Sequence, residues 1–417
     1  MLNTLLLFYI LLNLSRSKFA ALAGALFFAW HPVQIESVAW ISSLKDLLST
    51  TFSLLCLTAL LRWVPKDRTT WKFYALGLCC FVLALLAKPS AVMLPLCAAA
   101  VLCLFRSLAT KTAAIFLGPW LLLALPIAFL TKEAQPNGSM LFVTSWWQRP
   151  YIALDALGFY VSKLFIPINL SMDYGRTPHW VLHQLSPFAI LSIAFAGLVF
   201  FYRKSLSPLA KSLAIAALAL LPVLGFVPFL FQIFSTVADR YLYFPIALLA
   251  VGLSVSLAQT KDKRVWGGAA SLLLVLAVLC RHHVPRWQDG VHIFEHSVEV
   301  NPRSVLANNN LGVEYQVRSR FKEAAVSFAR ALELDPERYD LYGNLGAALV
   351  ASGNTREGIE KLRFAEANGA TPAIVHYNLG RAYLRLGQYT EARKYAALAL
   401  ELEPHTPRVQ DLYRATH

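Results

Sequence analysis

The stretch FFAWHPVQIESVAWISSLKDLLSTTFSLL, residues 27–55, places an apolar run on each side of a short polar segment. That segment contains four ionisable residues, His31, Glu36, Lys45 and Asp46. Ionisable residues beside membrane-spanning segments are costly to keep, and where they occur they commonly mark a functional site. The stretch therefore raises two questions, whether the flanking runs cross a membrane and what the polar segment does.

The composition indicates a membrane protein with a soluble tail. The chain has 417 residues, of which 57% are apolar and only 15% charged, whereas soluble domains carry about 25% charged residues. Apolar runs recur from residue 2 to residue 280 and then stop. We therefore predict an all-α fold that begins with a polytopic transmembrane helical bundle over residues 1–280.

Apolar segments that read as helices fall at 2–14, 19–30, 46–62, 73–87, 91–105, 112–130, 151–167, 186–202, 212–231, 241–258 and 265–280. If the segments 112–130 and 186–202 both cross the membrane, the stretch between them starts and ends on the same face. The segment 151–167 then cannot be a single complete span, so we expect it to be re-entrant or interfacial. The other segments predict about ten spans.

Positive charges separate the loops into two sets. One set holds fourteen Lys and Arg, and the other holds seven that are scattered singly. The positive-inside rule makes the first set cytoplasmic, which places residues 31–46 and the tail on the outer face. The first set is Arg16, Lys18, Arg62, Lys66, Arg68, Lys72, Arg106, Lys111, Arg203, Lys204, Lys211, Lys261, Lys263 and Arg264. Loop charges of this kind explain the net charge of +14, and they do not indicate nucleic-acid binding.

The tail repeats with a period of 34 residues. Leu311-Gly312, Leu345-Gly346 and Leu379-Gly380 recur at this spacing, with tetratricopeptide residues around them,. We predict a connector with a partial repeat helix at 281–304 and an α-solenoid over 305–417, with repeats at 305–338, 339–372 and 373–406. Such a solenoid can bind polypeptide in its groove, or it can serve as a spacer or dimer contact.

Several polar residues on the outer side are candidates for chemistry. His31, Glu36 and Asp46 fit acid–base or metal-linked chemistry on a lipid-borne substrate. Each also has a structural alternative: the Ser-x-x-Asp of residues 43–46 is a helix-capping signal, Glu36 can face headgroups, and His31 can close a turn. The further candidates are Lys88, Asp173, Tyr174, Asp239, Arg240, Tyr241 and Tyr243.

Four motifs resemble those of the transmembrane-and-tetratricopeptide O-mannosyltransferase family. They are the opening stretch with its HPV-x-x-E-x-VAW pattern, AKPSAVMLPL around Lys88, PINLSMDY before Gly175, and ADRYLYFP from Ala238. The resemblance implies a GT-C glycosyltransferase fold and a polyprenyl-phosphate sugar donor. By resemblance, Arg240, Lys88, Tyr241 and Tyr243 would bind the donor phosphate, His31, Glu36 and Asp46 would be catalytic, and Asp173, Tyr174 and Asp239 would line the substrate pocket.

The chain departs from the family at its beginning. Family members have a first span and a long outer loop with an acidic residue before the opening motif, so we expect an N-terminally truncated chain. The family also commonly has Lys-Glu where this sequence reads Lys88-Pro89, which removes a carboxylate.

Together these features predict a membrane enzyme that transfers a mannose-like sugar to a protein acceptor on the outer, periplasmic face of a bacterial inner membrane. The alternative is a catalytically inactive scaffold that recruits proteins through its repeats. An oligosaccharide ligase or polymerase fits less well, because the longest outer stretch has few Arg and His residues. No organic cofactor is implied, and a divalent metal stays open.

Overall fold

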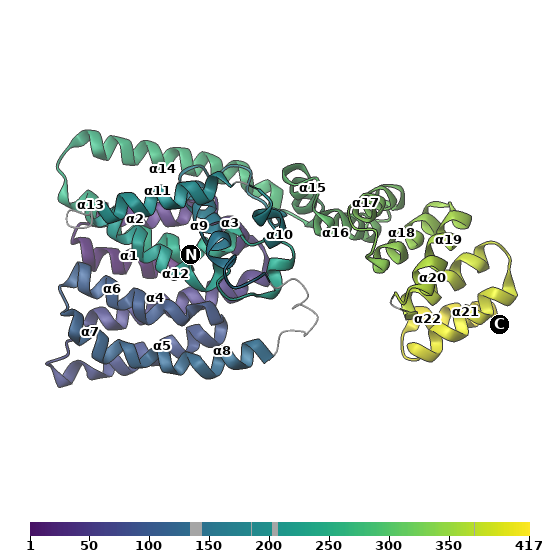
Figure 1. Cartoon of the computed structure of the whole chain (residues 1–417), viewed down its shortest axis with the longest axis horizontal. Coiled ribbons are helices and arrows are strands. Elements are labelled where there is room, and N and C mark those ends of the chain that lie inside the picture. The colour runs from purple at the N-terminus through teal and green to yellow at the C-terminus, as the bar shows by residue number, and fades with distance from the viewer. Residues whose placement is uncertain (134–143, 185, 202–206, 371) are drawn as a thin grey trace. The chain divides into compact units, whose positions relative to one another are not determined.

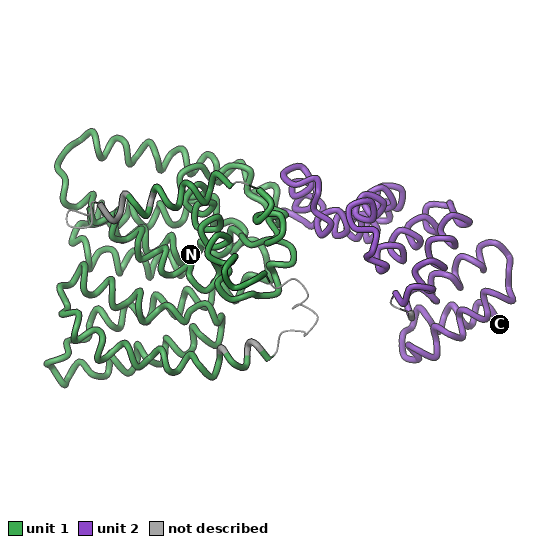
Figure 2. The backbone as a smooth tube through the Cα atoms, in the orientation of Figure 1, with its two compact units in different colours: residues 1–287 green, residues 288–417 purple. Residues whose placement is uncertain are grey.

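The computed structural model describes residues 1–133, 144–184, 186–201, 207–370 and 372–417 (Figure 1). Within these ranges all regular secondary structure is helical, as predicted. The chain divides into two compact units, Met1–Trp287 and Gln288–His417 (Figure 2). Arg203 and Lys204, two of the charges assigned to the cytoplasmic loops, lie outside the described residues.

The first unit is a bundle of long helices with two short ones, α3 and α10, near one end. The helices are α1 (Leu2–Ser15), α2 (Lys18–Trp30), α3 (Gln34–Ala39), α4 (Leu44–Arg62), α5 (Trp71–Ala87), α6 (Leu94–Arg106), α7 (Thr110–Leu117), α8 (Ala124–Glu133), α9 (Arg149–Phe165), α10 (Pro178–Leu182), α11 (Pro187–Phe201), α12 (Pro208–Leu220), α13 (Tyr243–Gln259) and α14 (Lys263–His283). Short 3₁₀ helices join them at Ile41–Ser43, Arg68–Thr70, Pro89–Met93, Gly118–Leu123, Leu221–Val223, Leu230–Ile233, Asp239–Leu242 and Val284–Trp287.

Six helical segments in the described ranges are long and apolar enough to cross a membrane: Ile41–Arg62, Arg68–Ala87, Pro89–Arg106, Thr110–Ile127, Asp239–Gln259 and Lys263–Trp287. Three apolar helical segments are shorter, Leu2–Ser15, Lys18–Trp30 and Pro208–Val223. Together with α11 they occupy the ten segments predicted as spans, and the crossing of a membrane by all ten stays a prediction. In the segment predicted at 212–231 the continuous helix ends at Val223, because a positive-φ turn at Gly225 follows, and a separate 3₁₀ helix begins at Leu230,.

The remaining apolar segment, 151–167, forms α9. One face of α9, including Ala156 and Tyr160, is fully buried, and the helix packs against α11. This face is part of the bundle core.

Helix α13 is the centre of the bundle. It contacts α1, α2, α4 and α12. Of the most apolar stretch in the segment Asp239–Gln259, which includes α13, 72% is buried. Glycines allow this close packing, since a Cβ at Gly252 would lie 2.5 Å from the carbonyl oxygen of Pro208, and one at Gly24 would lie 3.0 Å from that of Ala250,. By contrast, only 6% of the most apolar stretch in Lys263–Trp287, which includes α14, is buried. Helix α14 therefore exposes apolar side chains on most of its surface, as a lipid-facing helix does.

The two ends of the bundle differ in charge. In Figure 1 the α6–α7 and α13–α14 connections lie at the same, left-hand end of the unit, while α3 and α10 lie toward the other end. Four residues of the positively charged loop set lie in or directly beside these left-hand connections, Arg106, Lys111, Lys261 and Lys263. At the opposite end, Val284–Trp287 contacts α3, so the chain leaves the unit at the end that carries the opening motif.

The second unit consists of helix pairs, as the 34-residue period predicts. Its helices are α15 (Gly290–Val300), α16 (Val305–Val317), α17 (Phe321–Leu334), α18 (Tyr339–Ser352), α19 (Thr355–Ala367), α20 (Pro372–Arg385), α21 (Tyr389–Leu402) and α22 (Pro407–Thr416). Each pair packs tightly because its glycine lies against the partner helix. A Cβ at Gly312, for example, would lie 2.7 Å from Phe328. The helices α16, α18, α20 and α22 pack on one another in series.

Candidate functional site

The 3₁₀ helix Asp239–Leu242 connects the segments that carry the sequence motifs. Consecutive side chains of a 3₁₀ helix point about 120° apart, so neighbouring residues here reach different partners. Asp239 accepts hydrogen bonds from Tyr174, Arg240 contacts Glu36, and the ring of Tyr241 lies beside Lys88. The structure therefore brings together residues that lie up to 204 positions apart in the chain.

Glu36 and Arg240 form a buried bidentate pair. The backbone N–H of Arg240 donates to Glu36 Oε2 at 2.8 Å, and its Nη1 donates to Oε1 at 2.5 Å. The two side chains are only 1% and 8% exposed, and the guanidinium carbon of Arg240 lies 4.2 Å from the centroid of the Phe231 ring. Both carboxylate oxygens of Glu36 are thus occupied. The expectation that Glu36 faces lipid headgroups is wrong, since an ion pair inside the protein binds it.

Lys88 and Asp46 form a second pair, in which Lys88 Nζ donates to Asp46 Oδ1. The other oxygen, Asp46 Oδ2, is buried and has no hydrogen-bond partner among the described residues. Lys88 Nζ also lies 4.8 Å from the centroid of the Tyr241 ring, and the guanidinium carbon of Arg240 lies 5.1 Å from it. Both cations therefore lie close to the Tyr241 ring.

The predicted capping role of Asp46 is wrong. Helix α4 begins at Leu44 as the Ser-x-x-Asp signal indicates, but Ser43 makes no side-chain capping hydrogen bond. The carboxylate of Asp46 pairs with Lys88 instead, because a buried ammonium offers it a stronger partner than a backbone amide at a helix end.

A small pocket opens beside the Lys88–Asp46 pair. It lies between α4, the 3₁₀ helix Pro89–Met93, the end of α12 and the start of α13. Ser49, Thr50 and Ser53 form its polar wall on α4, where their spacing puts them on one face of the helix. The lining residues are Asp46, Ser49, Thr50, Ser53, Lys88, Ser90, Ala91, Ala219, Val223, Arg240, Tyr241, Tyr243, Phe244 and Pro245.

His31 lies apart from this pocket. It is fully buried, its Nε2 is 3.2 Å from the carbonyl oxygen of Leu164, and its backbone carbonyl accepts from Gln34 in the turn predicted for it. Burial lowers the pKa of His31 to about 4. The imidazole is therefore neutral near pH 7 and links the end of α2 to the end of α9.

Asp173, Tyr174 and Asp239 belong to a separate buried network and do not line the pocket. The Tyr174 hydroxyl donates to Asp239, 2.8 Å from each carboxylate oxygen. Asp173 Oδ1 accepts from the backbone N–H of Gly175, which has a positive φ. Asp173 thereby closes the turn that presents Tyr174.

Sequence reasoning missed a third buried ion pair, between Asp155 and Arg176. Arg176 Nη2 lies 2.5 Å from Asp155 Oδ1, which also accepts from the Ser186 hydroxyl. The guanidinium carbon of Arg176 lies 4.7 Å from the centroid of the Trp180 ring. A carboxylate inside the apolar segment 151–167 was the signal that could have found it, since such a residue needs a partner. The serine and threonine face of α4 was missed as well.

The described residues include no group of three or more His, Cys, Asp or Glu side chains that could hold a metal ion. The two carboxylates nearest the pocket, Glu36 and Asp46, are each paired with a cation. Neither carboxylate is therefore free of a cation in the described part of the chain, and a divalent metal stays a prediction.

Comparison with known proteins adds two curated relatives. A Caenorhabditis elegans protein O-mannosyl-transferase, F38B6.6, is 25% identical over 337 residues, covering 76% of this chain and 46% of that protein. The Drosophila melanogaster protein O-mannosyl-transferase Tmtc1 is 28% identical over 172 residues, covering 39% of this chain and 20% of that protein. The chain thus spans less than half the length of either relative. Because 76% of 417 residues exceeds the 287 residues of the first unit, the worm match includes residues of both units.

The Tetratricopeptide repeat family matches residues 373–406, the bounds predicted for the third repeat. Among solved structures, a chain from the APC/C hetero-tetramer Cut9–Hcn1 is 13% identical and covers 96% of this chain and 89% of that one. Its TM-score of 0.29 is too low to inform the fold. The two curated similarities and the repeat match agree with the resemblance found in the motifs: this chain is similar to the transmembrane-and-tetratricopeptide O-mannosyltransferases.

Proposed function

We propose that the chain is a membrane glycosyltransferase that moves a mannose-like sugar from a polyprenyl-phosphate donor to a hydroxyl group of a protein acceptor. The observation that carries this proposal is the pocket beside Asp46, which has two cations, Lys88 and Arg240, in its wall. The names of the two curated relatives support the reaction class.

The cations of the pocket suit a phosphate. The Lys88 ammonium and the Arg240 guanidinium carbon lie 4.8 Å and 5.1 Å from the centroid of the Tyr241 ring, and Thr50 and Ser90 also line the pocket. Such donors stabilise the negative charge that grows on a departing phosphate. Apolar residues at the end of α12 and the start of α13 line the other side, which suits the first carbons of a lipid.

In the proposed reaction the acceptor oxygen attacks the anomeric carbon of the sugar and forms the new glycosidic bond. The bond from that carbon to the phosphate oxygen breaks, and its electron pair leaves with the polyprenyl phosphate. The acceptor proton passes to a carboxylate, and Asp46 is the better placed one, because its Oδ2 has no partner among the described residues,. No step is assigned to a metal.

The other candidates then act indirectly. Glu36 holds Arg240 in place, and His31 holds α2 against α9. Asp239, Tyr174 and Asp173 fix the 3₁₀ helix that presents Arg240 and Tyr241. In this proposal Glu36 and His31 are positioning residues.

A catalytically inactive scaffold is the second candidate function. It is favoured by the pairing of both pocket cations with carboxylates, since a phosphate must compete with Asp46 and Glu36 for them. In this case the pairs serve only to hold the bundle together, and the repeats recruit proteins.

The test is transfer by the full chain in proteoliposomes, with polyprenyl-phosphate mannose labelled in the sugar and an envelope-protein extract as acceptor. Lys88→Ala should lower the transfer rate at least about 100-fold, as loss of a charge-stabilising donor does. The matched control is Lys45→Ala, because Lys45 is an exposed cation at the same end of the bundle. This variant should leave the transfer rate unchanged. A parallel reaction with EDTA tests whether the transfer needs a divalent metal. Equal rates for wild type and Lys88→Ala would overturn the site, and a wild-type protein without transfer favours the scaffold.

We also propose that the pocket and the tail face the periplasm of a bacterial inner membrane. The concentration of Lys and Arg in the connections at the other end of the bundle supports this orientation,.

A further inference from the structure

The connection between α4 and α5 carries more positive charge than its own carboxylate can offset. It has four exposed cations and one carboxylate, Asp67. The cations are Arg62, Lys66, Arg68 and Lys72. Within the part of the chain that the structure describes, none of the four forms an ion pair with an Asp or Glu. Their charge is therefore open to an external anion.

Asp67 is occupied inside the connection itself. Its Oδ1 accepts from the backbone N–H of Thr69 at 2.9 Å and from the Thr69 hydroxyl at 2.7 Å. The Thr70 hydroxyl accepts from the backbone N–H of Val64 at 2.9 Å and lies 3.0 Å from the Val64 carbonyl oxygen. These hydrogen bonds close the backbone into a defined turn, so the cations project from a fixed frame.

Aromatic rings hold this turn on the bundle. Trp63 is 5% exposed, and its ring centroid lies 5.1 Å from that of Tyr74 and 5.2 Å from that of Phe116. The Tyr74 hydroxyl donates to the carbonyl oxygen of Phe116 at 2.8 Å. By contrast, Trp71 is 38% exposed and Val64 50% exposed. The turn therefore presents apolar side chains as well as cations.

Two of the cations lie close to one ring. The guanidinium carbon of Arg62 lies 5.8 Å and Lys72 Nζ lies 5.4 Å from the centroid of the Phe73 ring. Arg62 Nη2 also donates to the Tyr9 hydroxyl at 2.7 Å, which holds its side chain there. Like charges held near each other repel. A bound anion would offset this repulsion, so the arrangement favours an anionic ligand.

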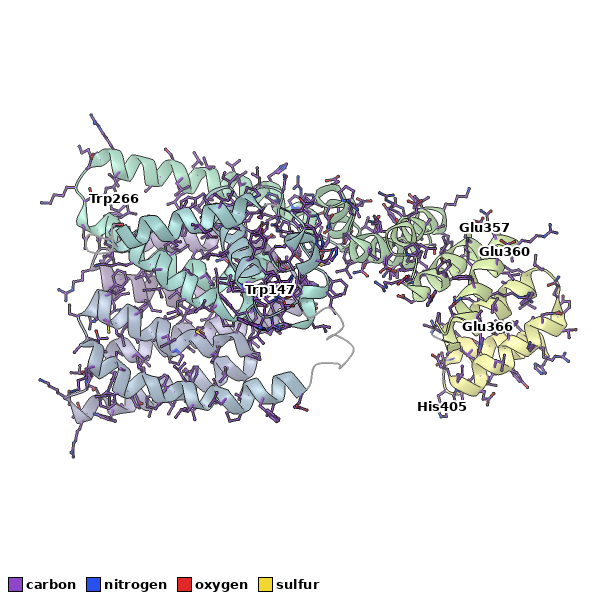
Figure 3. The ribbon with its side chains drawn as sticks, in the orientation of Figure 1. Trp147, Trp266, Glu357, Glu360, Glu366 and His405 are labelled. Atoms are coloured by element: carbon purple, nitrogen blue, oxygen red, sulfur yellow. The ribbon has the colours of Figure 1, made fainter. Side chains whose placement is uncertain are left out.

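The position of the turn indicates where the anion comes from. The helical segments Ile41–Arg62 and Arg68–Ala87, both long and apolar enough to cross a membrane, flank it. Only Ile41–Ser43 separates α3 from the start of α4, so α4 ends at the opposite, positively charged end of the bundle. Figure 3 shows Trp266 at this left-hand end, and Trp is typical of the membrane interface. The cations of the turn therefore lie at the depth of lipid headgroups.

We propose that the α4–α5 turn binds the phosphate of an anionic phospholipid, with Lys66, Arg68 and Lys72 as its contacts and Trp71 beside the first carbons of the acyl chains. A zwitterionic lipid offsets its phosphate with its own ammonium group, whereas an anionic lipid does not. Basic clusters next to membrane spans attract anionic lipids for this reason. The proposal concerns the end of the bundle away from the pocket and does not depend on sugar transfer.

Native mass spectrometry of the full chain in neutral detergent, titrated with phosphatidylglycerol, gives the Kd of the first bound lipid. The test variant is Lys66→Gln/Arg68→Gln/Lys72→Gln. These exposed side chains make no hydrogen bond to another described residue, so the variant should fold, and thermal melting verifies this. Arg68→Gln alone gives a second measurement with a single exposed change. The matched control is Lys261→Gln/Lys263→Gln/Arg264→Gln, which removes three exposed cations in or beside the α13–α14 connection at the same end.

The test variant should bind phosphatidylglycerol at least about tenfold more weakly than wild type, and Arg68→Gln about threefold or more, while the control stays within about twofold. Wild type should bind phosphatidylcholine at least about tenfold more weakly than phosphatidylglycerol. Equal affinity for the two lipids, or unchanged affinity in the test variant, overturns the proposal. Equal weakening in the test variant and the control also overturns it and assigns binding to the charge of the whole end. Displacement of the lipid by an equal concentration of free glycerol phosphate overturns it as well and assigns the turn to a soluble phosphate.

Discussion

At the scale of single residues, sequence pattern found the charged residues of the site but not their partners. Glu36, Asp46, Lys88 and Arg240 stand out because charge is rare beside membrane spans. Which cation meets which carboxylate depends on how segments 42 and 204 residues apart come together. No local pattern encodes that pairing, and the local pattern at Ser43 assigned Asp46 to a helix cap that does not form.

The Glu36–Arg240 pair predicts a strong asymmetry between single and double substitutions. Glu36→Gln leaves a buried guanidinium without its counter-charge, which costs about 3–5 kcal/mol, and the melting temperature in detergent should fall sharply. Glu36→Gln/Arg240→Gln removes both charges and should be more stable than Glu36→Gln alone. Fluorescence-detected size exclusion after heating measures both. If the double variant melts below the single one, the two side chains do not act as a pair.

His31 predicts how stability depends on pH. Its pKa is lowered from an ordinary value of 6.5 to about 4 in the folded protein, so the unfolded chain binds more protons between these values. Its contribution to stability is complete above pH 6.5 and is lost as pH falls toward 4, with a slope of up to about 1.4 kcal/mol per pH unit. The melting temperature of wild type should therefore fall relative to that of His31→Gln as the assay pH is lowered from 7.5 to 5. Parallel curves would show that His31 is not buried as a neutral group.

At the scale of elements, hydropathy located the helices well, because membrane spans are long apolar runs with polar ends. Their interruptions were harder to foresee. The segment 112–130 contains the 3₁₀ helix Gly118–Leu123, where Pro119 has no backbone N–H to continue the α-helix. The segment 151–167 appeared interfacial from loop counting, although one face of it is core. Apolar composition alone does not distinguish a helix that faces lipid from one that faces protein.

The packing of α13 predicts that its glycines are not interchangeable with alanine. A Cβ at Gly252 would lie 2.5 Å from the Pro208 carbonyl oxygen and 2.6 Å from Ser212 Oγ, so Gly252→Ala must push α12 away and should destabilise the bundle by about 1–3 kcal/mol. Gly267 is the control, since its Cβ would meet nothing within 4 Å. Gly267→Ala should be neutral or slightly stabilising through helix propensity. Thermal melting compares the two variants, and equal melting temperatures would contradict the close α12–α13 contact.

At the scale of the whole molecule, the repeat period and the loop charges say more than any single motif. The 34-residue period predicted the paired helices because one spacing recurs with the same small and large residues. Alternation of loop charge gives the bundle two unlike ends, and the structure puts the opening motif and the exit of the first unit, Val284–Trp287, at one of them. This contact predicts that the start of the tail and the pocket share one face of the membrane.

Reporter fusions test that prediction without assuming which face is which. We expect alkaline phosphatase to be active outside the cytoplasm when fused after His417, and inactive when fused after Lys66 or Lys261, because the positive connections stay inside. A green fluorescent protein fused at the same points should give the opposite pattern. Activity at all three points would mean that the spans do not alternate as the loop charges indicate. The reverse pattern would mean that the bundle has the opposite orientation in the membrane. The pocket would then face the cytoplasm, and a periplasmic reaction could not be part of the proposed function.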